Sequence, residues 1–506
     1  MKKTFLLFAT LLFWAISSAL AQEKDLLSLL PLQTDEDAPL FVPLADPLPY
    51  WVDTITSQPE GYVVDAEGNV EISSSDGLVW LISSVNGLNG CEPDDFDGRT
   101  VRLTNDIDFG EEGMNYQFSP IGTRETPFMG TFDGCGNRIC NLLMKHRYSY
   151  GGACNSDMGV FGYIRHATVC NITIDSTCYL CDYCENSEFC RGGIVGFVDS
   201  LSLVDNCHLH QLIGHHDYGS GLVGMNRNSI VRNCSVEAYS FGLCYGAGLV
   251  SYNYSTGDFT DAVVENCYFY GQIDDGSLNS VFTGGLVCLN RTDPNDNGKK
   301  AIIRNCHCTP TQRFSESNNG IFAYKLWQGS SIRNCYTDIT SFGSSAHMVG
   351  VNQGGELRDC SRYTNVDGVG TLALPITVNG TTTTNLLDAL NLWIAEQEHP
   401  ELYRTWTIVT DSIPVFGDYY IGVPENEAEN KEIAVYPNPT NGQVTIIGKN
   451  LRQAEVVNMF GQRIIIAKGE GNELHFDMEA LPSGVYFVNV TDTEGRQCVK
   501  KVVKNC

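Results

Sequence analysis

The chain has 506 residues, and its 60 acidic and 32 basic side chains give a formal net charge of −28 at pH 7. This balance argues against nucleic-acid binding, because that affinity rests on Lys and Arg contacts to phosphates. The length exceeds what one compact core holds, so we expect two or three domains. Plentiful Gly, Asn, Ser, Thr and Tyr predict a β-rich chain with many turns.

The first residues are typical of a secretory signal peptide. Two lysines precede the apolar run Phe5–Ile16, and small residues then lead to a cleavage site between Ala21 and Gln22. We therefore predict a signal peptide over residues 1–21 and an N-terminal extension over residues 22–74. The apolar run is shorter than the ~20 residues that a membrane span needs. No second apolar run reaches that length, so we expect membrane association only through surface attachment.

Two segments have the apolar periodicity of a short helix. The first runs from Ser75, a candidate N-cap, to Val85. The second follows Asn385 and places four apolar residues on one side: Leu386, Leu390, Trp393 and Ile394. The two segments flank a long stretch of repeats. Because a solenoid needs its ends covered, we predict that these helices cap it.

The stretch between the helices repeats itself from about residue 159 to residue 363. Each unit opens with a small-apolar-apolar-small run and closes on apolar-x-Asn-Cys. A repeat of this length indicates stacked units, none of which can bury its apolar face alone. Helical repeats would need longer apolar faces with 3.6-residue spacing, so the units predict parallel β-coils. The openings begin at Gly159, Gly193, Gly221, Gly248, Gly285, Gly320 and His347.

One column of the aligned units is asparagine. Asn tolerates the left-handed backbone conformation of a sharp corner, and its amide can bond to the copies above and below. We therefore predict corners at Asn141, Asn171, Asn206, Asn233, Asn266, Asn305 and Asn334.

The column after the corner is cysteine in most units. Stacked cysteines could form disulfides, a metal rail or a row of buried thiols. Free Cys packs like a small hydrophobe, and this column should face inward, so we predict thiols that stay mostly reduced. Its members are Cys207, Cys234, Cys267, Cys306, Cys335 and Cys360.

Two further cysteines occupy a different position. Cys140 and Cys170 each lie one residue before a corner asparagine, so the alternation of a strand points both outward. If their units are successive coils, the two are neighbours in an oxidising compartment, within reach of a bond. We therefore predict a Cys140–Cys170 disulfide.

The segment upstream of the repeats carries a family resemblance. Phe118-Ser-Pro-Ile-Gly and Pro127-Phe-Met-Gly-Thr-Phe-Asp-Gly, followed by repeated Gly-[Leu/Ile]-Val-Gly, resemble the GLUG-motif β-helix family. The resemblance implies an all-β, right-handed parallel β-helix, which we place at residues 75–421. That family includes surface proteins and a non-catalytic region of some bacterial immunoglobulin-A peptidases. The chain contains no His-Glu-x-x-His, so the zinc ligands and general base of a peptidase cannot be carried over.

Two clusters in the repeats have residue types that bind metals. One cysteine run has the spacing of a zinc or iron–sulfur ligand set, although export favours a disulfide-pinned loop; its members are Cys178, Cys181, Cys184 and Cys190. His208 and His210 lie on one side of a strand, where plain surface histidines are the commoner case.

A third candidate resembles a calcium loop. Asp293, Asn295 and Asn297 supply oxygens at the first, third and fifth positions, but the twelfth position is Arg304 instead of a bidentate Glu. We predict no bound metal or cofactor. Outward aromatic residues are more frequent than clustered acids, and a row of them could stack on sugars or on a partner protein. They are Tyr239, Tyr245, Tyr252, Tyr254, Tyr268, Tyr270 and Tyr336.

The composition changes near the C-terminus. Residues 422–432 are polar and acidic, which predicts a linker. In residues 433–506, short alternating strands between Gly, Asn and Pro turns predict a small Ig-like β-sandwich. Three motifs there closely resemble the sorting domain of the type IX (Por) secretion system. They include Pro437, Asn438, Pro439, Gly461, Leu481, Gly484 and Tyr486.

The resemblance implies export through the periplasm of a Gram-negative bacterium, with the type IX machinery as partner. The tail is usually removed, and the body is released or attached to the outer surface. Our interpretation is a secreted or surface-attached, non-enzymatic adhesin or binding protein for glycan or protein ligands. One alternative is a β-helix polysaccharide lyase or glycoside hydrolase, which needs carboxylates converging with a base. Another is a structural surface-layer component.

Overall fold

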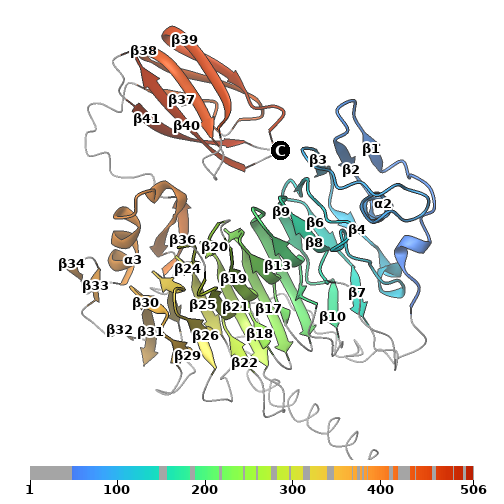
Figure 1. Cartoon of the computed structure of the whole chain (residues 1–506), viewed down its shortest axis with the longest axis horizontal. Helices are drawn as coiled ribbons and strands as arrows, with labels where there is room; N and C mark the ends of the chain where they lie inside the picture. Colours follow the sequence, from blue (N-terminus) through green and yellow to red (C-terminus); the bar gives the residue numbers. More distant parts are fainter. Residues whose placement is uncertain are drawn as a thin grey trace, which may run out of the picture. The chain divides into compact units, whose positions relative to one another are not determined.

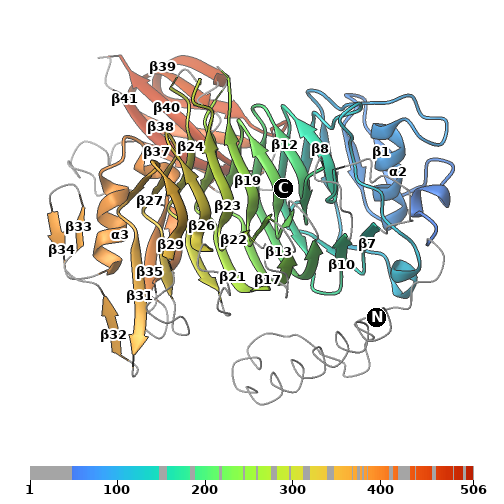
Figure 2. The same cartoon turned by 60° about the horizontal axis from the view of Figure 1, so that its bottom comes forward.

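The computed structural model describes residues 48–146, 157–182, 189–215, 219–242, 245–257, 260–274, 282–295, 298–310, 319–338, 347–366, 369–372, 376–378, 381–383, 386–408, 414–419, 433–438, 440–457, 463–481, 484–493 and 497–504. These residues form two large, mainly parallel sheets and an antiparallel sheet near the C-terminus (Figures 1 and 2). No helix among them is both long and apolar enough to cross a membrane.

The strands of the first sheet form two rows, one before and one after the corner of each coil. Strands of successive repeats pair in parallel and in register, as Val204 of β13 does with Val231 of β16. Before the corner lie β2 (Val70–Ile72), β3 (Thr100–Leu103), β5 (Thr131–Asp133), β16 (Ile230–Arg232), β20 (Ala262–Glu265), β24 (Ala301–Arg304), β27 (Ser331–Arg333) and β30 (Glu356–Arg358). After it lie β4 (Ile107–Asp108), β6 (Arg138–Cys140), β17 (Ser235–Gly242), β21 (Tyr268–Asp274), β25 (His307–Pro310), β28 (Tyr336–Asp338) and β31 (Ser361–Val366). Strands β9 (Thr168–Ile174) and β13 (Leu203–His215) run through the corner.

Shorter strands complete this sheet. β1 (Tyr62–Val64) and β32 (Val369–Leu372) pair antiparallel with β2 and β31, while β7 (Leu143–His146) pairs in parallel with β10 (Tyr179–Asp182). The second sheet is parallel throughout its described strands. It contains β8 (Phe161–Arg165), β11 (Arg191–Gly192), β12 (Val195–Asp199), β14 (Gly219–Ser220), β15 (Val223–Arg227), β18 (Tyr245–Ala247), β19 (Val250–Ser255), β22 (Phe282–Gly284), β23 (Val287–Thr292), β26 (Gly320–Trp327) and β29 (His347–Gln353).

The corner asparagines have the predicted backbone conformation, with φ between 48° and 55° from Asn171 to Asn334. Their side chains form a ladder in which each amide donates to the oxygen of the copy before it. The Nδ2–Oδ1 distances are 2.9 Å from Asn206 to Asn171 and 2.8 Å from Asn305 to Asn266. Asn233 instead donates to Asp205 Oδ1 at 2.6 Å. The ladder satisfies amides that burial would otherwise leave without partners.

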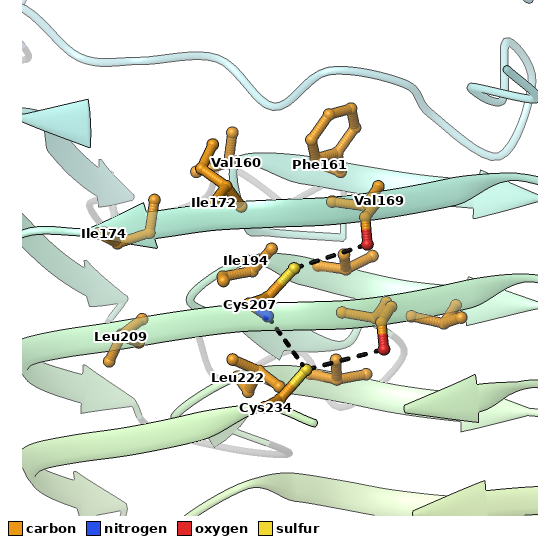
Figure 3. Close-up of a cluster of buried hydrophobic side chains, with 14 of the residues drawn as sticks. Val160, Phe161, Val169, Ile172, Ile174, Ile194, Cys207, Leu209, Leu222 and Cys234 are labelled. Atoms are coloured by element: carbon orange, nitrogen blue, oxygen red, sulfur yellow. Dashed lines mark hydrogen bonds between the residues drawn. The ribbon is translucent and has the colours of Figure 1, made fainter. Parts of the chain in front are cut away.

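The cysteines after the corner face the core, as the column alignment predicted. Cys207, Cys234 and Cys267 are at most 1% exposed. Figure 3 shows Cys207 and Cys234 stacked among aliphatic side chains, with the backbone N–H of Cys207 donating to Cys234 Sγ at 3.4 Å. Burial raises the pKa of the Cys207 and Cys234 thiols well above its ordinary value, which keeps them protonated.

The opening glycines of the repeats lie where the coils approach most closely. A Cβ added to Gly248 would lie 2.3 Å from the carbonyl oxygen of Gly285 and 2.3 Å from the Phe269 ring. A Cβ on Gly221 would lie 2.2 Å from the carbonyl oxygen of Gly248. The first residue of the motif is therefore glycine because neither backbone nor core leaves room for a side chain.

The register corrects the prediction for the most N-terminal corner. Cys170 lies beside Asp133, and Cys140 lies beside Asp108, so the two cysteines belong to different columns. Asn141 likewise donates to Asp108 Oδ1, at 2.7 Å, and forms a corner separate from that of Asn171. The predicted Cys140–Cys170 disulfide is therefore wrong. Cys170 shares its column with Asp133 and Asp205 and is buried, at 4% exposed.

Helix α2 (Ser75–Asn86) forms where it was predicted, although Ser74, not Ser75, is its N-cap. Its apolar residues, including Leu78 and Leu81, join the core of the coils. Short 3-10 turns, η2 (Trp51–Asp53) and η3 (Glu111–Asn115), lie in the same N-terminal region.

The second predicted helix, α3 (Leu386–Ala395), belongs to a segment that we call the strap. The strap also contains η4 (Pro400–Leu402), β35 (Arg404–Ile408) and β36 (Pro414–Tyr419). Its backbone carbonyls accept bonds from the corner ladder: Asn266 donates to Leu402 at 2.9 Å, and Asn305 donates to Arg404 at 3.0 Å. The strap thus packs along the corners, which differs from the predicted end cap. The hairpin β33 (Ile376–Val378)–β34 (Thr381–Thr383) precedes it.

The C-terminal segment forms a five-stranded antiparallel sheet with its own core. The strands are β37 (Ala434–Tyr436), β38 (Gln443–Val457), β39 (Arg463–Asp477), β40 (Gly484–Asp492) and β41 (Gln497–Lys504). Val456, Val488 and Val490 are fully buried in it.

The Gly248→Ala substitution tests the close approach of the coils. We expect it to lower the free energy of unfolding by about 3 kcal/mol, because the new methyl group meets backbone that cannot move away. The measurement is the urea midpoint. Gly298→Ala is the control: its φ is +87° but open space surrounds it, so only backbone strain of ~1 kcal/mol is expected. Equal shifts for both variants would contradict the crowding argument.

Candidate binding surface

The outer face of the second sheet carries a group that we call the aromatic–cationic surface: Tyr252 and Tyr254 of β19, Arg291 of β23, and Lys325 and Trp327 of β26. All five side chains are half-buried. Arg291 lies between two rings, with its guanidinium carbon 5.4 Å from the Tyr254 centroid and 5.7 Å from the Trp327 centroid. Lys325 Nζ is 4.4 Å from the Trp327 centroid. Tyr252 and Tyr254 stack at 5.2 Å.

A second, buried asparagine ladder fixes these strands. Asn253 lies between the two tyrosines in sequence and points inward, as do Asn226 and Asn290 in the neighbouring strands. Asn226 donates to Asn253, and Asn253 to Asn290, each at 2.8 Å. Because side chains alternate along a strand, holding Asn253 inward holds Tyr252 and Tyr254 outward.

Two arginines near this surface have carboxylate partners, whereas Arg291 and Lys325 do not. Toward the N-terminus, Arg227 forms two bonds to Asp199, at 2.7 and 2.8 Å, and Arg124 forms two similar bonds to buried Asp157. Those carboxylates neutralise their arginines. Arg291 donates instead to the Tyr252 hydroxyl at 3.3 Å, and no ion pair with a carboxylate of the described residues involves it or Lys325. The rings therefore orient Arg291, whose charge interacts with the nearby Asp293 carboxylate but forms no direct ion pair within the described residues.

In the segment that resembles a calcium loop, the first carboxylate already has hydrogen-bond partners within the protein. Asp293 accepts from the Asn295 backbone N–H at 2.9 Å and from the Tyr254 hydroxyl at 3.2 Å. These bonds hold the pKa of Asp293 below its ordinary value. Asn297 lies outside the described residues. The loop thus anchors Tyr254, one member of the aromatic–cationic surface.

The cysteine run is only partly described. Cys178 and Cys190 are buried, and burial raises the pKa of each thiol to about 12. The side chain of Cys181 and all of Cys184 lie outside the described part. Among the residues that the structure describes, no group of three His, Cys, Asp or Glu side chains could hold a metal ion.

The two histidines join a polar network on the first sheet. His210 Nδ1 lies 3.3 Å from Glu237 Oε2, and the Tyr268 hydroxyl donates to Glu237 Oε1 at 2.5 Å. The hydrogen bond to Glu237 raises the pKa of His210. His208 bonds to Ser235 at 2.7 Å, and burial, with His210 nearby, lowers its pKa to about 4. Both histidines thus have hydrogen-bond partners within the protein, and these bonds link neighbouring strands of the first sheet.

Three of the acidic residues on the coils are paired with arginine or histidine. Glu265 bonds to Arg304 at 2.7 Å, and Glu356 pairs with Arg333. With Glu237 held by His210 and Tyr268, these three carboxylates lie on different coils and each serves its own neighbour. They do not converge on one position.

Sequence reasoning identified Tyr252 and Tyr254 as outward aromatics but missed Arg291, Lys325 and Trp327. Val250 and Val287 share one column, so counting from them aligns Tyr252 with Leu289 and Tyr254 with Arg291. The sequence alignment could therefore have placed Arg291 beside Tyr254. In strand β26, however, Gly320 pairs with Gly284 and Ala323 pairs with Val287, so Gly320 lies one residue before the column of the opening glycine Gly285. Counting from the motif glycine therefore assigns Lys325 and Trp327 to the wrong face.

The C-terminal sheet shows how the chain leaves the cell. Residues 434–505 match the secretion system C-terminal sorting domain. This sorting domain indicates export by type IX secretion from a Gram-negative cell, to the surface or the medium, and interaction with that machinery. No curated protein and no solved structure matches the chain.

The sorting-motif residues take several places in this domain. Tyr486 on β40 is buried at 6% exposed, and Leu481 packs against the same core. Gly484 begins β40, and Pro437 and Asn438 follow β37. Pro439 and Gly461 lie outside the described residues, as do the predicted cleavage residues Ala21 and Gln22.

Acid should destabilise the strap through His307. Its ring stacks on Tyr336 at 4.2 Å and meets Trp406 edge-on, and burial lowers its pKa to about 3. Below the unfolded pKa of ~6.5, the unfolded chain binds a proton that the folded chain does not, so stability falls as pH falls. We expect His307→Phe to reduce the loss of stability between pH 7 and pH 5 by about 1–2 kcal/mol.

The measurement for this variant is the urea midpoint at both pH values. Phe keeps a ring between Tyr336 and Trp406 but loses the 2.7 Å hydrogen bond to Thr309. We therefore expect the variant to be less stable than the wild type at pH 7, and its stability to change less between pH 7 and pH 5. His475→Phe, on the C-terminal sheet, serves as the control. An unchanged slope in His307→Phe would show that His307 does not control the acid sensitivity.

Proposed function

We propose that this exported protein is a non-enzymatic adhesin or binding protein for glycan or protein ligands. Its body would be a right-handed parallel β-helix of the GLUG-motif type over residues 75–421. The observation that carries the proposal is the aromatic–cationic surface, which presents Tyr254, Arg291 and Trp327 side by side on a rigid sheet. Aromatic rings and arginine are the residue types that dominate the energy of binding surfaces.

Two further observations support binding over catalysis. The carboxylates Glu237, Glu265 and Glu356 are each engaged by a basic neighbour and lie apart. Sorting through type IX secretion delivers the protein to the cell exterior, where a surface ligand would be met. A rigid coil stack holds the surface with little entropy left to lose on binding.

Binding is tested with mature protein purified from the medium or cell surface, on an array of glycans and extracellular-matrix proteins. We expect Trp327→Ala to weaken the strongest interaction at least about tenfold, because a central aromatic anchor is lost. Val63→Ala, an exposed apolar residue on β1, is the control and should bind like the wild type. No retained ligand, or full binding by Trp327→Ala, would refute the proposal. Release of cleaved sugar would favour the enzymatic alternative.

Tail removal is a separate prediction. We expect the sorting domain to be cut off within residues 422–432, because that segment is polar and acidic and precedes the matched domain. Intact-mass analysis of exported protein should give a species ending in that range. Shortening the segment by deletion should leave the tail attached. Exported wild-type protein that still ends at Cys506 would contradict this prediction.

A further inference from the structure

We infer that the ligand of the aromatic–cationic surface is an acidic polysaccharide that carries uronate carboxylates. This inference rests on the proposed binding function and names its ligand class. The first observation is that neither Arg291 nor Lys325 forms a direct ion pair with a carboxylate of the described residues, so both cations can accept an external carboxylate. In a chain with a net charge of −28, Arg227 of the same sheet is instead neutralised by buried Asp199.

The second observation is how Arg291 is oriented. Tyr254 and Trp327 lie on either side of it, and the Tyr252 hydroxyl accepts one of its N–H groups. The guanidinium is therefore fixed before any ligand arrives, and it keeps donors for a second partner. A planar fork of N–H donors matches a carboxylate, which can accept two parallel bonds. Fixing the fork in advance reduces the entropy lost on binding.

The third observation is the neighbourhood of rings and charges. A sugar ring presents C–H groups on its face, which pack against an aromatic ring, and its hydroxyls and carboxylate lie at its edge. A uronate stacked on Tyr254 or Trp327 would therefore direct its carboxylate sideways, toward Arg291 or Lys325. Lys325 Nζ lies 4.4 Å from the Trp327 centroid, close enough to serve the same sugar.

A polymer fits this surface better than a single sugar. Met225, Tyr252, Leu289, Lys325 and Val351 follow one another in register across five strands, so the face continues along the stack. Neighbouring strands lie about 4.8 Å apart. A chain of sugars laid across the strands would meet Tyr254, Arg291 and Trp327 in turn, which multiplies weak contacts without a deep pocket.

The test uses the exported protein and pairs of polysaccharides that differ only in their acidic group. Polygalacturonate is compared with its carboxyl-reduced form, and dextran sulfate with dextran, by biolayer interferometry. We expect polygalacturonate to bind at least about tenfold more tightly than the reduced polymer. Arg291→Gln should remove most of that preference, because the variant loses the charge-assisted bonds to the carboxylate. Lys325→Gln should remove part of it.

Arg165→Gln is the matched control, since Arg165 is an exposed arginine in the same column of the sheet, beyond Asp199 and Arg227. Thermal melts of each variant confirm folding. Equal binding of both polygalacturonate forms, or binding of dextran sulfate alone, would overturn the uronate assignment and leave a glycan-binding function intact. Binding only to matrix proteins would overturn it and favour a protein ligand. No binding to any array component would overturn the proposed function as well.

Discussion

In-register stacking of parallel coils is the constraint on which the rest of this structure depends. Each residue of a coil lies about 4.8 Å from its copies in the coils before and after it. A column is therefore stable only if its residue tolerates copies of itself on both sides. Asparagine does so through its amide, the opening glycine by having no side chain, and cysteine by packing as a small apolar group. The sequence repeats follow from these three solutions.

The outward columns escape that constraint, because solvent accepts most side chains there. Ser251 and Asn253 alternate with Tyr252 and Tyr254, so buried polar and exposed aromatic residues share one strand. The inner ladder that includes Asn253 fixes the register of this strand. A shift of the register by one residue would turn both tyrosines into the core. A rigid interior thus lets the outer face vary in chemistry without loss of the fold.

The same logic explains how far the sequence could lead. Corners, inward cysteines and helix α2 were predictable, because each rests on residue types with one stable placement. The N-terminal corner was not: apolar-Cys-Asn occurs in β6, at Cys140, and in β9, at Cys170, at two different corners, and spacing alone cannot separate them. Trp327 was missed because Gly320 pairs with Gly284 and not with the opening glycine Gly285, and the sequence of this unit does not show that offset of one residue. The packing of the strap along the corner asparagines could not be predicted, because it depends on hydrogen bonds to backbone carbonyls and not on a pattern of side chains.

The contrast between two kinds of arginine gives the outer face its meaning. Arg227 is locked by two bonds to Asp199, so its charge is consumed within the protein and its role is structural. Arg291 is held by rings and by a hydroxyl, which fix its direction without a direct ion pair. Maintaining such a cation costs little while water solvates it, and an anionic ligand replaces that water with a paired charge. The aromatic–cationic surface is therefore prepared for an external partner, whereas the paired arginines beside it hold the sheet together.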